Sequence, residues 1–128
     1  MNCEIQNAEG AAIVTLSGDV DLESSPRVRS ALLECVKSKS NVIVDMSGVD
    51  YIDSSGVASL VEAFQTARKN GTAFVLAKVS DAALRVLELA RLDKVFTIVD
   101  DVADGLDNGG GGRGRTVRTA VGGRRQSP

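Results

Sequence analysis

Histidine is absent from the 128 residues of this chain. A Ser–His–Asp or Cys–His catalytic relay, an HExxH zinc site and a phosphohistidine all require that side chain, so the chain cannot form any of them by itself. A hydrolase made from the remaining residue types would need another base for its serine, such as lysine. The composition therefore favours a protein that works by binding rather than an enzyme, and no pattern in it indicates a cofactor or a metal.

Aromatic side chains are also scarce. They make up 3% of the chain and tryptophan is absent, whereas hydrophobic residues make up 43%. We expect a small core of Val, Leu, Ile and Ala, of the size that one domain of this length supports. The chain offers no aromatic ladder on which bases stack, which argues against a nucleic-acid partner.

Cysteines and long apolar runs are few as well. Cys3 and Cys35 lie far apart in apolar patterns, so we interpret both as small core residues rather than as a disulfide scaffold or a redox pair. No apolar run approaches the ~18 residues of a membrane span. The first residues, Met1-Asn2-Cys3-Glu4, lack the basic and apolar regions of a signal peptide. We therefore expect a cytoplasmic protein without membrane insertion.

The net charge of −2 is unevenly distributed along the chain. All 17 acidic residues but only ten of the 15 basic ones precede residue 109, so this part carries a net charge of −7. An acidic body disfavours a nucleic-acid surface and favours basic partners. The remaining five basic residues are Arg113, Arg115, Arg118, Arg124 and Arg125.

Apolar segments with a strand-like period alternate along the chain with segments of helical period. The first helix is expected to follow Ser25-Pro26, where a hydroxyl N-cap precedes a proline at the first helical position. The second is expected to end at Asn70-Gly71, which is a strong C-cap signal. The pattern predicts strands at 3–7, 11–16, 42–46, 72–77 and 96–99, and helices at 26–36, 57–70, 81–90 and 100–106.

The resulting order, β-β-α-β-α-β-α-β-α, predicts an α/β fold with a mixed central sheet covered by helices. The first two strands form a hairpin, with residues 3–7 near an edge of the sheet. We expect Gly18 to end the second strand and Gly48 to turn the chain after the third. Residues 1–107 form the single domain, and the Gly- and Arg-rich residues 108–128 form a disordered tail without an assigned role.

One stretch, Asp53-Ser54-Ser55-Gly56, places small polar groups where the chain enters the second helix. A first interpretation is helix capping, although capping needs one such residue and a glycine in the first turn costs about 1 kcal/mol. A second is an anion site at the helix N-terminus, either for a ligand or for a phosphate carried covalently by a serine. The spacing of these residues supports a capping role and a functional role about equally.

A third interpretation is an aspartyl phosphate, as in a receiver domain. Asp45 or Asp53 is the candidate acceptor, and Lys78 follows the next strand. The first clear strand, however, ends in Leu16-Ser17-Gly18, without the adjacent acidic pair that holds Mg²⁺. The opening hairpin also does not match that fold, so we regard this interpretation as the weakest of the three.

Three segments together resemble one known family. Val49-Asp50-Tyr51-Ile52-Asp53-Ser54-Ser55-Gly56-Val57 is the most specific, and Leu16-Ser17-Gly18-Asp19-Val20-Asp21 and Leu89-Ala90-Arg91-Leu92-Asp93-Lys94-Val95-Phe96 support it. Over about residues 3–106 the chain is similar to the STAS domain, and most closely to the bacterial anti-sigma factor antagonists. The match departs from the antagonists' frequent Gly-Leu-Gly at Gly56-Val57-Ala58-Ser59.

The resemblance implies a phosphorylation-controlled partner switch with Ser54 as the phosphoacceptor. A serine kinase that is also an anti-sigma factor modifies Ser54, the unmodified protein binds that kinase and releases a sigma factor, and a PP2C-type phosphatase restores the serine. An alternative is a STAS subunit of a phospholipid-type ABC transport complex, or a partner-switching regulator that acts without a sigma factor. The implied partner surface comprises Asp19, Asp21, Asp53, Ser54, Ser55, Gly56 and Val57.

Overall fold

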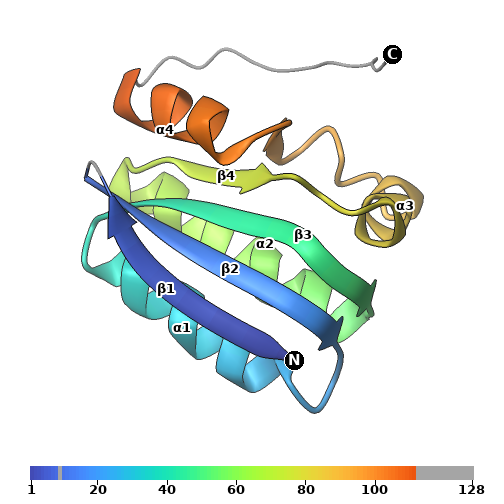
Figure 1. The fold of residues 1–128 in the computed structure, drawn as a ribbon. Helices are drawn as coiled ribbons and strands as arrows, with labels where there is room; N and C mark the ends of the chain where they lie inside the picture. The colour runs from blue at the N-terminus through green and yellow to red at the C-terminus, as the bar shows by residue number, and fades with distance from the viewer. Residues whose placement is uncertain (9, 112–128) are drawn as a thin grey trace.

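The computed structural model describes residues 1–8 and 10–111 (Figure 1). Its elements follow the predicted β-β-α-β-α-β-α-β-α order, so the α/β assignment is confirmed. The elements are β1 (Asn2–Ala8), β2 (Ala11–Val20), α1 (Ser25–Lys37), β3 (Asn41–Ile52), α2 (Ser54–Asn70), β4 (Phe74–Ala77), α3 (Asp81–Leu89), β5 (Thr97–Val99) and α4 (Val102–Gly111).

The strands form one mixed sheet in the order β1-β2-β3-β4-β5. β1 and β2 pair antiparallel as the predicted hairpin, and the remaining neighbours are parallel. Helices α1 and α2 lie side by side on one face, whereas α4 lies on the other (Figure 1). Because the parallel strands all end at the same edge of the sheet, the loops that follow β2 and β3 meet there.

Alternate residues of the central strands face two separate apolar layers. Val42 and Val44 belong to the larger cluster under α1 and α2, while Ile43 packs with Val102 and Leu106 of α4. The core is aliphatic as expected, apart from a group of three rings in which Phe64 is edge-to-face with both Phe74 and Phe96. Cys35 is buried and Cys3 is half-buried, both as free thiols.

The two glycines expected to end strands do not do so. β2 continues through Gly18 to Val20, and β3 continues through Gly48 to Ile52. The pairing shifts register between Thr15 and Ser17 and again after Gly18, whose φ is +84°. A Cβ on Gly48 would lie 2.8 Å from the Ser17 Cβ, so this glycine permits close approach of two paired strands rather than a turn.

The last helix also differs from the expected one. α4 extends to Gly111, beyond the end expected near Leu106, and so includes residues 108–111 of the segment expected to be disordered. At Gly105 the helix backbone comes close to the sheet, because a Cβ there would lie 3.2 Å from Ile43 Cγ2. Residues 112–128 lie outside the described part of the chain, so the disordered tail and the domain boundary remain predictions.

Candidate functional site

Asp53 is the residue that caps α2. Its backbone is extended, and its Oδ1 accepts hydrogen bonds from the N–H groups of Ser55 and Gly56 at 2.9 and 3.2 Å. These are two of the N–H groups that a helix start leaves without a partner in the helix. The capping interpretation therefore holds for Asp53, and neither Ser54 nor Ser55 is needed for it.

The second oxygen of Asp53 connects α2 to the loop between β2 and α1. Oδ2 accepts a hydrogen bond from the Leu22 N–H at 3.1 Å, and the Asp53 N–H donates to the Val20 carbonyl at 3.2 Å. One carboxylate thus holds together two loops that are 31 residues apart. The segment around Asp21 is thereby brought beside the start of α2.

Ser54 and Ser55 differ in their environments. Ser54 is the first residue of α2 and is exposed, whereas Ser55 is half-buried. Among the described residues, neither hydroxyl makes a hydrogen bond, while the Ser55 carbonyl accepts one from the Ser59 hydroxyl at 3.1 Å. Ser54 is therefore the more accessible of the two hydroxyls.

Gly56 has a packing role that the sequence did not reveal. A Cβ at this position would lie 2.7 Å from both Ile52 Cγ1 and the Val20 carbonyl oxygen, and 2.8 Å from Val20 Cγ1. Only glycine lets the first turn of α2 approach the ends of β2 and β3 this closely. Packing thus explains why a residue with low helix propensity stands in the first turn, and the buried Gly56 contributes no side chain to a binding surface.

Asp21 caps the turn that leads into α1. Its Oδ1 accepts from the Ser24 N–H and hydroxyl, both at 3.1 Å, and its own N–H donates to Ser24 Oγ at 3.0 Å. The hydrogen bond from the Ser24 N–H lowers the pKa of this carboxyl below its usual value, and the hydrogen bond from the Ser24 hydroxyl is the second-largest cause. The predicted N-cap at Ser25 is wrong, because Ser25 is already the first helical residue and donates its N–H to the Asp21 carbonyl at 2.8 Å.

Asp19 stands at the same edge of the sheet. It is exposed near the end of β2, where its Cα pairs with that of Tyr51 on β3. Its carbonyl accepts a hydrogen bond from Ser24 Oγ at 3.0 Å, which ties it to the Asp21 loop. The structure thus places Asp19 and Asp21 on adjoining segments, next to the loop that carries Asp53.

An apolar groove between α2 and α3 was missed by sequence reasoning. It has a volume of about 710 Å³, and Leu89 on its α3 side is 80% exposed. Ser54, Ala58 and Gln65 follow one another at helical spacing along its α2 side, which is the signal that could have located it. The lining residues are Ser54, Val57, Ala58, Val61, Glu62 and Gln65 of α2, Val86 and Leu89 of α3, and Ala90, which follows α3 as its C-cap.

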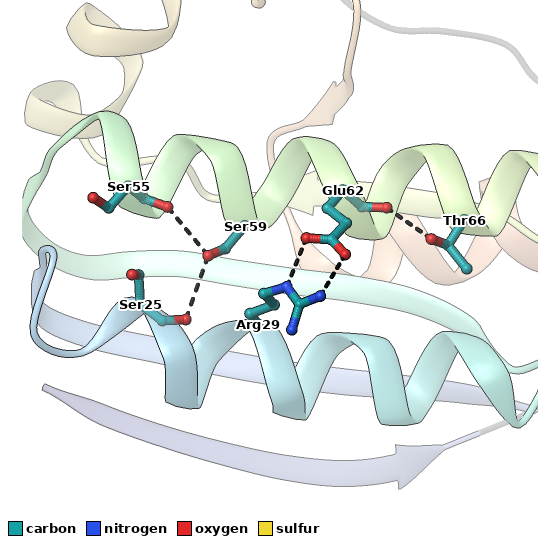
Figure 2. Close-up of polar contacts among 6 residues, drawn as sticks. All are labelled: Ser25, Arg29, Ser55, Ser59, Glu62 and Thr66. Atoms are coloured by element: carbon teal, nitrogen blue, oxygen red, sulfur yellow. Dashed lines mark hydrogen bonds and ion pairs between the residues drawn. The ribbon is translucent and has the colours of Figure 1, made fainter.

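Polar contacts between α1 and α2 hold the α2 wall of this groove in place (Figure 2). The buried Ser59 hydroxyl lies 3.3 Å from the Ser25 carbonyl, to which it donates. The Arg29 guanidinium forms a bidentate ion pair with Glu62, in which Nε donates to Oε1 at 2.6 Å and Nη2 donates to Oε2 at 2.8 Å. These hydrogen bonds lower the pKa of Glu62. Ser59 thus faces α1, whereas its neighbour Ala58 lines the groove.

Asp45, the alternative phosphate acceptor, is already engaged. Its Oδ1 accepts hydrogen bonds from the Ser47 N–H at 3.0 Å and from the Ser47 hydroxyl at 2.8 Å. Within the described ranges, no three His, Cys, Asp or Glu side chains group as a metal site would require, and no helix is long and apolar enough to cross a membrane.

Comparison with known proteins identifies the family. The model of the STAS domain matches residues 2–105. The chain belongs to the STAS domain family. Relatives of this STAS protein include an anti-sigma-B factor antagonist of Bacillus subtilis, 24% identical over 77% of this chain and 90% of that protein. Another, of Listeria monocytogenes, carries the same description and is 30% identical over 66% of this chain and 75% of that protein.

A solved structure shows the same fold. It is that of an anti-sigma factor antagonist from Mycobacterium paratuberculosis, with a TM-score of 0.77 and 24% identity. The match covers 84% of this chain and 92% of that one. The single mixed sheet with its helical cover, predicted from the sequence, is therefore the fold of solved STAS proteins.

Proposed function

We propose that this STAS protein is an anti-sigma factor antagonist whose binding to its partner is controlled by phosphorylation of Ser54. The observation that carries the proposal is the position of Ser54, an exposed hydroxyl at the start of α2 that also lines the α2–α3 groove. The names of the relatives support the same role. The proposed partners are an anti-sigma factor with serine kinase activity and a PP2C-type phosphatase.

The surface supports binding rather than catalysis. The groove gives a partner an apolar contact area, and the adjoining segments carry the carboxylates of Asp19, Asp21 and Asp53. Backbone N–H groups hold both carboxylates, those of Ser55 and Gly56 for Asp53 and that of Ser24 for Asp21, so their charges are fixed in position. A partner that brings apolar side chains to the groove and cations to its acidic end fits this surface.

Phosphorylation changes the groove at its Ser54 end. The kinase transfers the γ-phosphoryl group of ATP to Ser54 Oγ, the hydroxyl proton leaves to the kinase, and ADP is released. The product carries about −1.5 to −2 charges at pH 7. The N–H groups of Ser55 and Gly56 already donate to Asp53, so they do not neutralise the new charge.

The modified groove binds its partner less well for two reasons. First, the phosphate occupies space that the partner's side chains fill. Second, the bound partner removes the strongly hydrated phosphate from water, and this desolvation costs several kcal/mol unless the phosphate gains new hydrogen bonds or ion pairs. A cation on the partner offsets part of that cost. We therefore expect at least about a tenfold loss of affinity, which corresponds to about 1.4 kcal/mol.

The kinase step is tested by incubation with ATP and the anti-sigma factor kinase, followed by mapping of the phosphate. Wild-type protein and Ser55→Ala are expected to be modified to the same extent, and Ser54→Ala not at all. Ser55→Ala is the matched control because it removes the neighbouring hydroxyl from the same helix turn. Phosphate on another residue, or full modification of Ser54→Ala, contradicts the proposal.

Binding to the same partner tests the switch. Ser54→Ala is expected to bind as the unmodified protein does, and Ser54→Asp to bind more weakly because it places a carboxylate at the groove. Equal binding of both variants would instead favour a constitutive docking subunit, such as a STAS component of a transport complex.

A further inference from the structure

Strand β1 leaves one long edge of the sheet open. It is the outermost strand in the order β1-β2-β3-β4-β5, and it pairs with β2 over seven consecutive residues without a register shift. The opposite edge strand, β5, has only three residues. In the part of the chain that the structure describes, no other strand pairs with the outer side of β1. Its outward N–H and C=O groups are therefore available to another chain.

β1 lacks the features that usually protect an edge strand. Its sequence, Asn2-Cys3-Glu4-Ile5-Gln6-Asn7-Ala8, contains no proline, no lysine and one charged residue. Proline, lysine and β-bulges are the common means of preventing edge-to-edge pairing. At the centre of the strand Ile5 is 43% exposed, although its pairing partner Val14 is fully buried.

We propose that β1 pairs antiparallel with β1 of a second copy of this chain, about a two-fold axis at Ile5. The two sheets then form one continuous sheet, and the interface is isologous. In this register Ile5 faces Ile5 of the second copy, and Cys3 faces Asn7. The single charge, Glu4, faces the amide of Gln6 rather than another carboxylate.

The register follows from the length and the charge of the strand. An axis at Ile5, the middle residue of Asn2–Ala8, lets all seven residues of β1 pair. A two-fold axis at Glu4 would place two carboxylates directly opposite each other, which is destabilising. With the axis at Ile5, the two exposed isoleucines lie on the face that carries Val14 and the main core, so pairing extends that apolar layer. Burial of Ile5 then contributes to association, because exposed apolar area is removed from water.

This interface is separate from the groove between α2 and α3. Figure 1 shows β1 at one edge of the sheet and α3 on the far side of β2 and β3 from it. Val86 and Leu89 of α3 line the groove. The dimer therefore leaves both grooves open. Failure of the Ser54 switch and failure of β1 pairing are independent results, because the first is measured by phosphorylation and the second by mass.

Sedimentation equilibrium of the full chain tests the register through Gln6. Gln6→Lys places a cation opposite Glu4 twice per dimer, whereas Gln6→Glu places two pairs of carboxylates opposite each other. Cross-strand charge pairs change stability by about 0.2–1 kcal/mol each, so we expect the dimer dissociation constant to fall about 2- to 30-fold in the first variant and to rise by a similar factor in the second. Ile5→Lys is expected to be monomeric, and Leu89→Lys, which changes an exposed groove residue, to match the wild type.

Cross-linking gives a second, register-specific readout. In the proposed dimer Cys3 of one copy faces residue 7 of the other, so Asn7→Cys is expected to give a covalent dimer under mild oxidation. Gln6→Cys, which places its thiol on the other face of the strand, is the control and is expected not to do so. A wild-type chain that is monomeric at about 100 μM, or a dimer that persists in Ile5→Lys and responds equally to both Gln6 charge variants, overturns the proposal.

Discussion

The carboxylate of Asp53 serves two structural purposes, and substitution can separate them. Oδ1 caps α2 through the N–H groups of Ser55 and Gly56, and Oδ2 accepts from Leu22 in the β2–α1 loop. Asp53→Ala removes both. Asp53→Asn keeps one side-chain oxygen, and asparagine caps a helix about as well as aspartate does. Its NH₂ group replaces the oxygen that accepts the hydrogen bond from the Leu22 N–H, so this hydrogen bond is lost.

The expected magnitudes follow from this division. Loss of an N-cap costs about 1 kcal/mol, with a range of about 0.5–2, and loss of the loop hydrogen bond costs about another 1 kcal/mol. We therefore expect Asp53→Ala to lower the free energy of unfolding by about 2 kcal/mol and Asp53→Asn by about 1 kcal/mol.

Urea unfolding of the full chain, followed by circular dichroism at pH 7, measures these differences. Ser55→Ala is the control. Its hydroxyl makes no hydrogen bond among the described residues, so its change is expected to stay within about 0.5 kcal/mol. An Asp53→Asn protein as unstable as Asp53→Ala, or an Asp53→Ala protein as stable as the wild type, would refute the assignment of separate roles to the two oxygens.

Three further predictions concern the same end of the molecule. Gly56→Ala, which on an open helix surface is stabilising, is expected here to lower the free energy of unfolding by about 1–3 kcal/mol, because the new Cβ overlaps Val20; thermal unfolding gives the sign. Asp21 has a lowered pKa in the folded state, mainly through the Ser24 N–H, so its contribution to stability is present above its unfolded pKa and is lost as the pH falls through the folded one. Asp21→Asn is therefore expected to flatten the loss of stability below about pH 4, measured by urea unfolding across that range. Leu89→Lys is expected to weaken partner binding at least about tenfold without a change in stability, since Leu89 lies exposed on the groove; affinity and melting temperature together check it.

Much of the fold was predictable from sequence because each element carries its own periodicity. The β1–β2 alternation and the helical spacing of Val28, Leu32 and Val36 are local signals, and the observed elements follow their predicted order. The predictions that Gly18 ends a strand and that Gly48 turns the chain were wrong. In a sequence, a glycine that interrupts a strand cannot be distinguished from one that permits two strands to approach closely. The Ser17 Cβ that Gly48 accommodates lies on a different strand.

The candidate site was predictable only in part for a similar reason. The position of Ser54 at a helix start follows from the strand and helix patterns on either side of it. The groove beside it does not, because a third of its lining, including Val86 and Leu89, comes from the α3 side and is brought to α2 only by tertiary packing. The second hydrogen bond of Asp53, to Leu22, spans 31 residues and has no local signal.

Phosphorylation of Ser54 is proposed to control partner binding. The most direct measurement is the affinity of the anti-sigma factor kinase for the unmodified chain and for a chain that carries phosphate at Ser54 alone, determined by calorimetry. We predict at least about tenfold weaker binding of the phosphorylated chain, and recovery after treatment with a PP2C-type phosphatase. Equal affinities for the two forms would show that phosphate at Ser54 does not control binding.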